Sequence, residues 1–136
     1  MKLINGRLII NENEIDEACE KLRGIVQSKL DTLGHGNVIV DVVFDNECWN
    51  EKTCAMWCEI DINLLTSSGF LGCISFTTES YEPTLVYTNQ FEFYYVFEQS
   101  SNTCTNPTDM LNTGHSKLKC VKCLEQILLD DLYERL

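Results

Sequence analysis

Apolar residues at the start of the chain flank an Asn5-Gly6 pair and then change to a helical spacing. Asn-Gly is a typical tight-turn dipeptide, so residues 1–10 are predicted to form a short hairpin or an edge strand. From Asn13 the pattern is that of an amphipathic helix, with acids in its first turn and Gly34 at its end. Its predicted buried side consists of Ile15, Ala18, Cys19, Leu22, Ile25, Val26, Leu30 and Leu33.

Between residues 37 and 98 the sequence predicts strands, at residues 37–44, 54–62, 70–78, 84–88 and 91–98. The first stretch is dense in Val and Ile, and residues 54–62 alternate clearly between apolar and polar, as strands with one buried face do. In the second stretch Cys58 and Ile60 lie on the apolar side, and Glu59 lies on the opposite side. The polar sides are predicted to point away from the core.

The rest of the pattern completes an α+β prediction. Residues 99–115 hold most of the turn-forming residues and are expected to be a long, mobile loop, and residues 116–136 return to a helical pattern. Strands joined by short links favour an antiparallel sheet. We therefore predict a single α+β domain over residues 1–136, with an antiparallel sheet of about five strands. The N-terminal and C-terminal helices are predicted to pack on one face of this sheet.

Charge is distributed unevenly along the chain. The net charge is −11, and residues 30–116 carry one base, Lys52, against twelve acids, whereas the two ends are balanced. A field of that sign repels nucleic acid and anionic membranes and attracts basic proteins. We therefore expect a basic protein partner, no direct binding of nucleic acid and no membrane association.

The eight cysteines are open to three interpretations: core residues, zinc ligands or redox groups. No charged and apolar leader opens the sequence, so a cytoplasmic location with reduced thiols is expected (the host cytoplasm if the protein is viral). Most cysteines share a side with apolar residues, which favours burial as small hydrophobic side chains. Zinc is the weaker interpretation, because only one closely spaced pair occurs among the candidate ligands Cys54, Cys58, Cys120 and Cys123.

No catalytic or cofactor motif occurs in the sequence. It contains no glycine-rich phosphate loop, no G-x-S-x-G and no H-E-x-x-H. His35 lies between two glycines and is interpreted as an exposed loop residue, and nothing in the spacing pairs His115 with a cysteine nucleophile. We therefore expect a protein without enzymatic activity and without a cofactor.

The polar side of the strands is the candidate partner-binding surface. Its predicted residues are Asp41, Trp57, Glu59, Asp61, Glu92, Tyr94 and Glu98. Alternate residues lie about 6.8 Å apart on a strand and neighbouring strands about 4.8 Å apart, so the acids could approach the charge density of nucleic acid. The leading hypothesis is an inhibitor or nucleic-acid mimic that blocks a basic nucleic-acid-binding surface on another protein, such as a nucleic-acid enzyme. The composition is similar to that of small acidic inhibitors from phages and mobile elements, by analogy alone.

Alternatives stay open at this point. The acidic side of the sheet could be a solvated surface that keeps the protein soluble. A structural or assembly protein, such as a virion component, could use the same face or its strand edges to form a homodimer or larger assembly. The third alternative is a small zinc-binding or thiol protein, which metal analysis of the reduced protein would identify.

Overall fold

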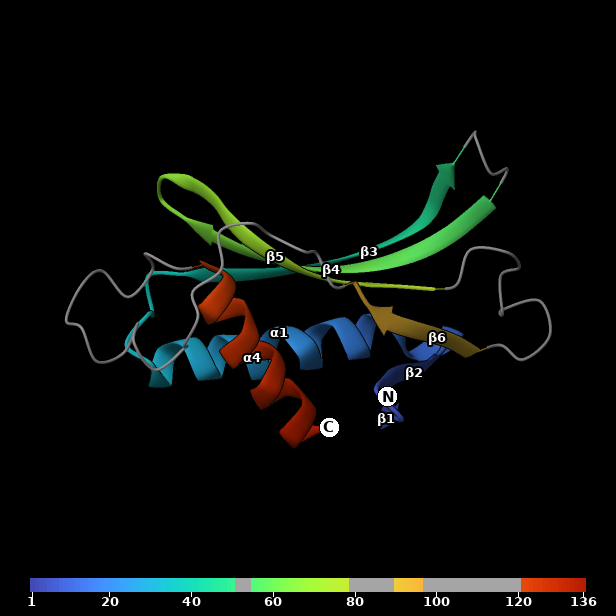
Figure 1. Cartoon of the computed structure of the whole chain (residues 1–136), viewed down its shortest axis with the longest axis horizontal. Coiled ribbons are helices and arrows are strands. Elements are labelled where there is room, and N and C mark those ends of the chain that lie inside the picture. Colours follow the sequence, from blue (N-terminus) through green and yellow to red (C-terminus); the bar gives the residue numbers. More distant parts are fainter. Residues whose placement is uncertain (51–54, 79–89, 97–120) are drawn as a thin grey trace.

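A sheet covered on one face by two helices forms the framework of the protein (Figure 1). The computed structural model describes residues 1–50, 55–78, 90–96 and 121–136. The strands are β1 (Lys2–Ile4), β2 (Arg7–Asn11), β3 (Ile39–Asn50), β4 (Ala55–Thr66), β5 (Gly69–Thr77) and β6 (Gln90–Tyr95). The helices are the short 3-10 turn η1 (Glu12–Glu14), α1 (Ile15–Thr32) and α4 (Val121–Arg135).

The strands lie in the order β1-β2-β6-β5-β4-β3, and each neighbouring pair is antiparallel. The predicted α+β class and the two helices on one face are therefore confirmed. The described residues hold six strands, close to the five expected, because the N-terminal hairpin contributes two strands to the same sheet. The strand predicted at residues 84–88 and the loop predicted at residues 99–115 lie outside the described residues.

The N-terminal hairpin forms as its sequence predicts. Asn5 and Gly6 both have positive φ angles, of 52° and 77°, which is the backbone that a tight two-residue turn requires. Strand β2 then pairs with β6, with Arg7 opposite Tyr94 and Leu8 opposite Phe93. The hairpin thus extends the sheet on the side away from β3.

Among the described residues, strands β5 and β6 pair over a short length. Their register there contains Phe76 opposite Tyr95 and Thr77 opposite Tyr94, and β6 then diverges from β5 (Figure 1). Helix α4 covers the part of β5 that β6 leaves open, where the buried Glu125 carboxylate accepts a hydrogen bond of 3.2 Å from the Cys73 backbone N–H. This acceptor satisfies a backbone group that a strand would otherwise pair.

The core lies between the sheet and the helices. The strands contribute alternate residues, including Ile60 and Ile62 of β4 and Phe76 of β5, and all three are fully buried. Helix α1 buries Ile15, Ala18, Leu22, Val26 and Leu30, which confirms most of its predicted arc, and α4 buries Cys123, Leu124, Leu128, Leu129 and Leu132. Burying each Leu, Ile, Val or Phe side chain of this core contributes about 1.5 to 3 kcal/mol.

The expectation for His35 is wrong. This residue is only 3% exposed, although glycines flank it on both sides. The chain reverses at Gly34, where φ is 81°, and the His35 N–H then donates to the Leu30 carbonyl at 2.8 Å. Because the turn folds back against the end of α1, the side chain that follows the glycine is directed inward.

Candidate binding surface

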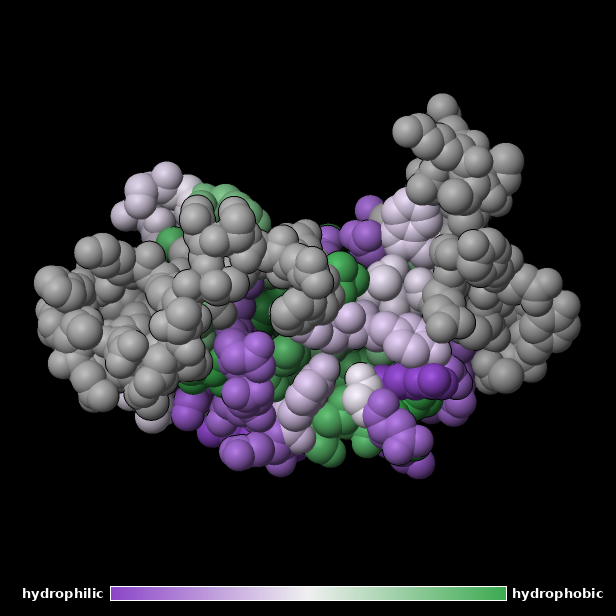
Figure 2. Space-filling view, in the orientation of Figure 1, coloured by the Kyte–Doolittle hydropathy of each residue, from purple (hydrophilic) through white to green (hydrophobic). Residues whose placement is uncertain are grey.

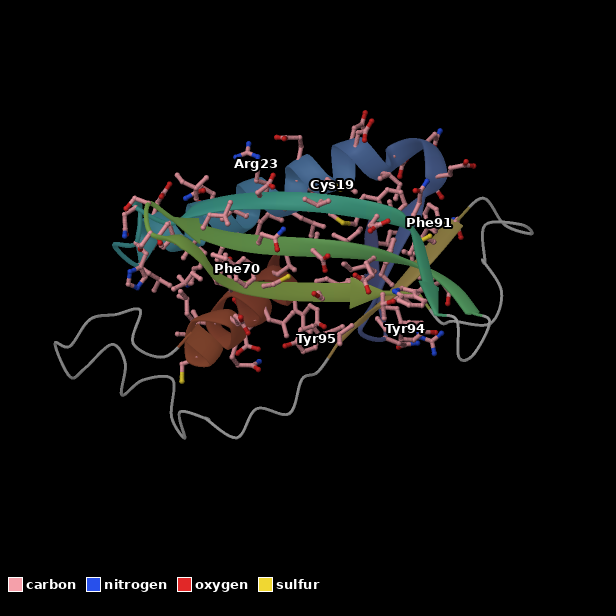
Figure 3. All side chains as sticks on the ribbon, turned by 90° about the horizontal axis from the view of Figure 1, so that it is seen from above. Cys19, Arg23, Phe70, Phe91, Tyr94 and Tyr95 are labelled. Carbon is pink, nitrogen blue, oxygen red and sulfur yellow. The ribbon has the colours of Figure 1, made fainter. Side chains whose placement is uncertain are left out.

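The face of the sheet opposite the helices, called the outer face below, carries the predicted binding residues. Because Ile60 and Ile62 point into the core, the alternate residues Glu59 and Asp61 of β4 point the other way. Figure 1 shows that the sheet rises at the β4–β5 turn and again at the opposite end, where β3 ends and β4 begins, so the outer face is concave along its strands, and Figure 2 shows the dip between these two ends. Figure 3 looks down on this face.

Six of the seven predicted residues lie on the outer face. They are Asp41 of β3, Trp57, Glu59 and Asp61 of β4, and Glu92 and Tyr94 of β6. Asp41 is exposed and the other five are half-buried. The seventh residue, Glu98, lies outside the described residues.

Strands β3 and β4 form an acidic patch, which consists of Asp41, Asp45, Glu59 and Asp61. Asp45, which was not among the predicted residues, lies directly opposite Glu59 in the ladder, and Val43 lies opposite Asp61. Like charges directly opposite each other destabilise a sheet. Among the described residues, no Lys or Arg forms an ion pair with Asp41, Glu59 or Asp61.

Neutral donors hold two carboxylates of the acidic patch in place. The Trp57 indole N–H donates to Glu59 at 2.7 Å, and the Ser75 hydroxyl donates to Asp61 at 2.7 Å. Both bonds join side chains that are two residues apart or on neighbouring strands, so the sheet itself sets their geometry. The carboxylates are therefore oriented without their charge being neutralised.

The part of the outer face formed by β2 and β6 has a different character. Arg7 of β2 forms an ion pair with Glu92 at 3.4 Å, and its guanidinium lies 4.8 Å from the centre of the Tyr94 ring. An exposed ion pair contributes about 0 to 1 kcal/mol, and a cation over an aromatic ring about 0.5 to 1 kcal/mol. Glu92 and Tyr94 are thus already partnered, so they do not extend the acidic patch.

An apolar end of the outer face was not predicted. Ile39 of β3 lies opposite Leu65 of β4, and Leu65 lies opposite Phe70 of β5. Ile39 is 57% exposed and Phe70 is 67% exposed. Figure 3 shows Phe70 far from Tyr94, at the end of the sheet next to the β4–β5 turn. The signal was present in the sequence, because Ile39 has the same alternation as Asp41.

The Cys73 thiol of β5 borders the acidic patch. The Cys73 sulfur lies 3.2 Å from the Ser75 hydroxyl oxygen. Burial raises the pKa of the Cys73 thiol, and the charges of Asp61 and Glu125 add to the increase, while the Ser75 hydrogen bond opposes it. A raised pKa leaves less of the reactive thiolate at neutral pH, which disfavours nucleophilic chemistry at Cys73.

Cys19, Cys58 and Cys123 are also free thiols. Cys58 and Cys123 are buried in the core, and burial raises the pKa of Cys58 and of the half-buried Cys19. The zinc candidates Cys54 and Cys120 lie outside the described residues. Within the described ranges, no three His, Cys, Asp or Glu side chains come together in a group that could hold a metal ion.

Comparisons with known proteins do not indicate a function for this chain. No protein-family model matches the chain, and no curated protein and no solved structure matches it. In the part of the chain that the structure describes, neither helix combines the length and the apolar character needed to cross a membrane.

Proposed function

We propose that this is a non-enzymatic acidic binding protein, an inhibitor that covers a basic nucleic-acid-binding surface on a partner protein. The observation that carries the proposal is the acidic patch on β3 and β4. Two carboxylates, Asp45 and Glu59, face each other across neighbouring strands, and no described cation pairs with Asp41, Glu59 or Asp61.

The energetics of the patch favour a role in binding over a role in solubility. An opposite-charge pair across a ladder contributes roughly 0.2 to 1 kcal/mol, whereas like charges directly opposite cost stability. Solubility alone is served by surfaces of mixed sign. A basic partner would donate charge-assisted hydrogen bonds to the carboxylates of Asp41, Glu59 and Asp61, which accept them from Lys and Arg as phosphates do.

Spacing and shape support the comparison with nucleic acid. Glu59 and Asp61 are alternate residues of one strand, about 6.8 Å apart, and the acids of β3 lie on a strand about 4.8 Å away. One DNA strand carries a charge about every 3.4 Å. The concave outer face suits a convex basic surface, and Trp57 beside the patch is the kind of aromatic residue that anchors interfaces.

Preorganisation strengthens the argument. Because Trp57 and Ser75 already hold Glu59 and Asp61, these two side chains lose little conformational freedom when a partner binds. The raised pKa of Cys73, which lies next to the same patch, supports a binding role over thiol chemistry.

The test is capture of partners by immobilised protein from an extract of its native host. We expect the retained proteins to be basic and nucleic-acid-binding, to be released as salt rises, and to be displaced by a DNA or RNA oligonucleotide. The double variant Glu59→Lys with Asp61→Lys should lose this retention.

A matched control removes the effect of net charge alone. The double variant Glu12→Lys with Glu134→Lys changes two exposed acids away from the outer face and has the same net charge as the first variant. It should retain the partners. Equal retention by both double variants, with melting temperatures unchanged, would mean that the acidic patch is only a solvated surface.

A further inference from the structure

Strand β3 forms one edge of the sheet and is 12 residues long. It pairs with β4 on one side, and no described strand lies on its other side. A strand edge presents unpaired backbone N–H and C=O groups, which are a ready template for another extended chain. The long edge of β3 is therefore able to pair with another extended chain.

Part of the edge already has a substitute for a strand. The Gln27 side chain of α1 donates to the Val38 carbonyl at 2.8 Å and accepts from the Val40 N–H at 3.1 Å. The groups of Val38 and Val40 thus face away from β4. Because this direction alternates along an antiparallel strand, the N–H and C=O groups of Val42 and Phe44 face the same way. No described side chain bonds to these groups of Val42 and Phe44.

We propose that the edge of β3 from Val42 to Phe44 binds an extended basic segment of the partner protein as an added strand. The Gln27 side chain of α1 already bonds the Val38 carbonyl and the Val40 N–H. The added strand would bond the next outward-facing groups of β3, those of Val42 and Phe44. This inference rests on the proposed function, because it takes the partner to be a basic protein.

The side chains of β3 specify the segment. Asp41, Val43 and Asp45 point to the outer face, and all three are exposed. Side chains directly opposite on a neighbouring strand lie about 4.5 to 5.5 Å away. The segment should therefore place a β-branched residue beside Val43 and Lys or Arg beside Asp41, with which no described cation pairs. A second base opposite Asp45 keeps the segment complementary to the negative charge of β3.

The same charges disfavour a second copy of this chain as the occupant. If two copies of β3 paired antiparallel about Val43, Asp41 of each copy would lie opposite Asp45 of the other. The new ladder would then contain two pairs of directly opposite aspartates, and such like-charge pairs are destabilising. A basic segment converts both of these repulsions into attractions.

The probe is the capped peptide Thr-Lys-Thr-Val-Thr-Lys-Thr, titrated into the isotope-labelled full-length protein while amide hydrogen exchange is followed. Binding should slow exchange at the Val42 and Phe44 amides by about tenfold or more, because these N–H groups become bonded. The Val43 amide should not change, since its N–H faces β4. This contrast between adjacent residues distinguishes strand addition from binding elsewhere on the outer face.

A second peptide tests the backbone bonds without altering the protein. N-methylation of the peptide amides that would face β3 removes these bonds and keeps both lysines, and it should weaken binding about tenfold or more. On the protein side, Val42→Pro removes an N–H that does not bond to β4, so the sheet should still form. The N-methylated peptide remains informative even if that variant does not fold.

The outcomes separate this inference from the proposed function. Protection at Val42 and Phe44 that is lost with the N-methylated peptide supports strand addition. Equal binding of both peptides, or no binding, overturns it, and so does a dimer with these amides already protected before peptide is added. The proposed function is tested independently by Glu59 and Asp61, which lie on β4 away from the edge.

Discussion

A single row of side chains crosses the outer face and has opposite character at its two ends. The row runs through Asp45, Glu59, Thr77, Tyr94 and Arg7, each directly opposite the next on a neighbouring strand. At the β3 end two acids face each other, whereas at the β2 end Arg7 covers Tyr94 and pairs with Glu92. The two ends share one sheet and one core, so the difference between them comes from which parts of the chain meet there.

The origin of the strands explains the contrast. Strands β3 and β4 both come from the stretch of the chain that is nearly free of Lys and Arg, so neither can neutralise the other. Strand β2 comes from the charge-balanced N-terminal part and supplies Arg7 to β6. The acidic character is therefore preserved where sequence neighbours pair and lost where distant segments pair.

The largest expected effect is on the free energy of unfolding, from a substitution in the core that both ends share. Ile62 is fully buried beneath the acidic patch, and Ile62→Ala should lower the free energy of unfolding by about 2 to 5 kcal/mol. Val43→Ala, which truncates an exposed residue on the opposite face, should change it by less than about 0.5 kcal/mol. Urea denaturation measures both, and a comparable loss in the two variants would mean that the outer face is also part of the core.

The next effect concerns the aromatic residues at the two ends. With a captured partner, Trp57→Ala should weaken binding by about 2 kcal/mol or more, because it removes the proposed aromatic anchor beside the acidic patch and the donor to Glu59. Tyr94→Ala should cost less, since Arg7 already covers that ring. Calorimetric titration of both variants provides the comparison, and Trp57→Phe separates the ring from its N–H. A larger loss for Tyr94→Ala would move the binding site to the β2–β6 end.

A smaller effect is expected at the basic end. Arg7→Ala removes a half-exposed ion pair and a cation over a ring, so the free energy of unfolding should fall by about 1 kcal/mol or less. The same change should maintain or strengthen binding of a basic partner, because it removes a positive charge from the outer face. Thermal unfolding and partner titration test this, and weaker binding would show that Arg7 itself contacts the partner.

The smallest expected effect is a change in the pKa of Cys73, which is sensitive to the charge of the acidic patch. Its folded-state pKa is raised above the ordinary thiol value of 9.0, so the unfolded chain loses this proton first as pH rises. The thiol therefore stabilises the fold fully below about pH 9, and this contribution is lost as pH rises through the folded pKa. Asp61→Asn should lower the pKa of Cys73, which the pH dependence of its alkylation rate would measure. An unchanged rate profile would mean that Asp61 does not act on the thiol.

Much of the outer face followed from alternation alone. The apolar residues around Trp57, Glu59 and Asp61 were sufficient to direct these three side chains away from the core, whatever the strand order. The same rule should have included Ile39 and Asp45, which share a side with Asp41. Ile39 is apolar although it lies on the polar side, and Asp45 comes after the stretch 37–44, because β3 continues to Asn50.

Other features depended on pairings that no local pattern contains. The sequence by itself determined the two helices, the N-terminal hairpin and the faces of the strands, because these follow from spacing over a few residues. Tertiary structure alone decided that Arg7 meets Glu92, 85 residues away, that Glu125 bonds to the Cys73 N–H, and that His35 is buried. These contacts depend on strand order and on helix placement, which are set by burial of the whole core rather than by neighbouring residues.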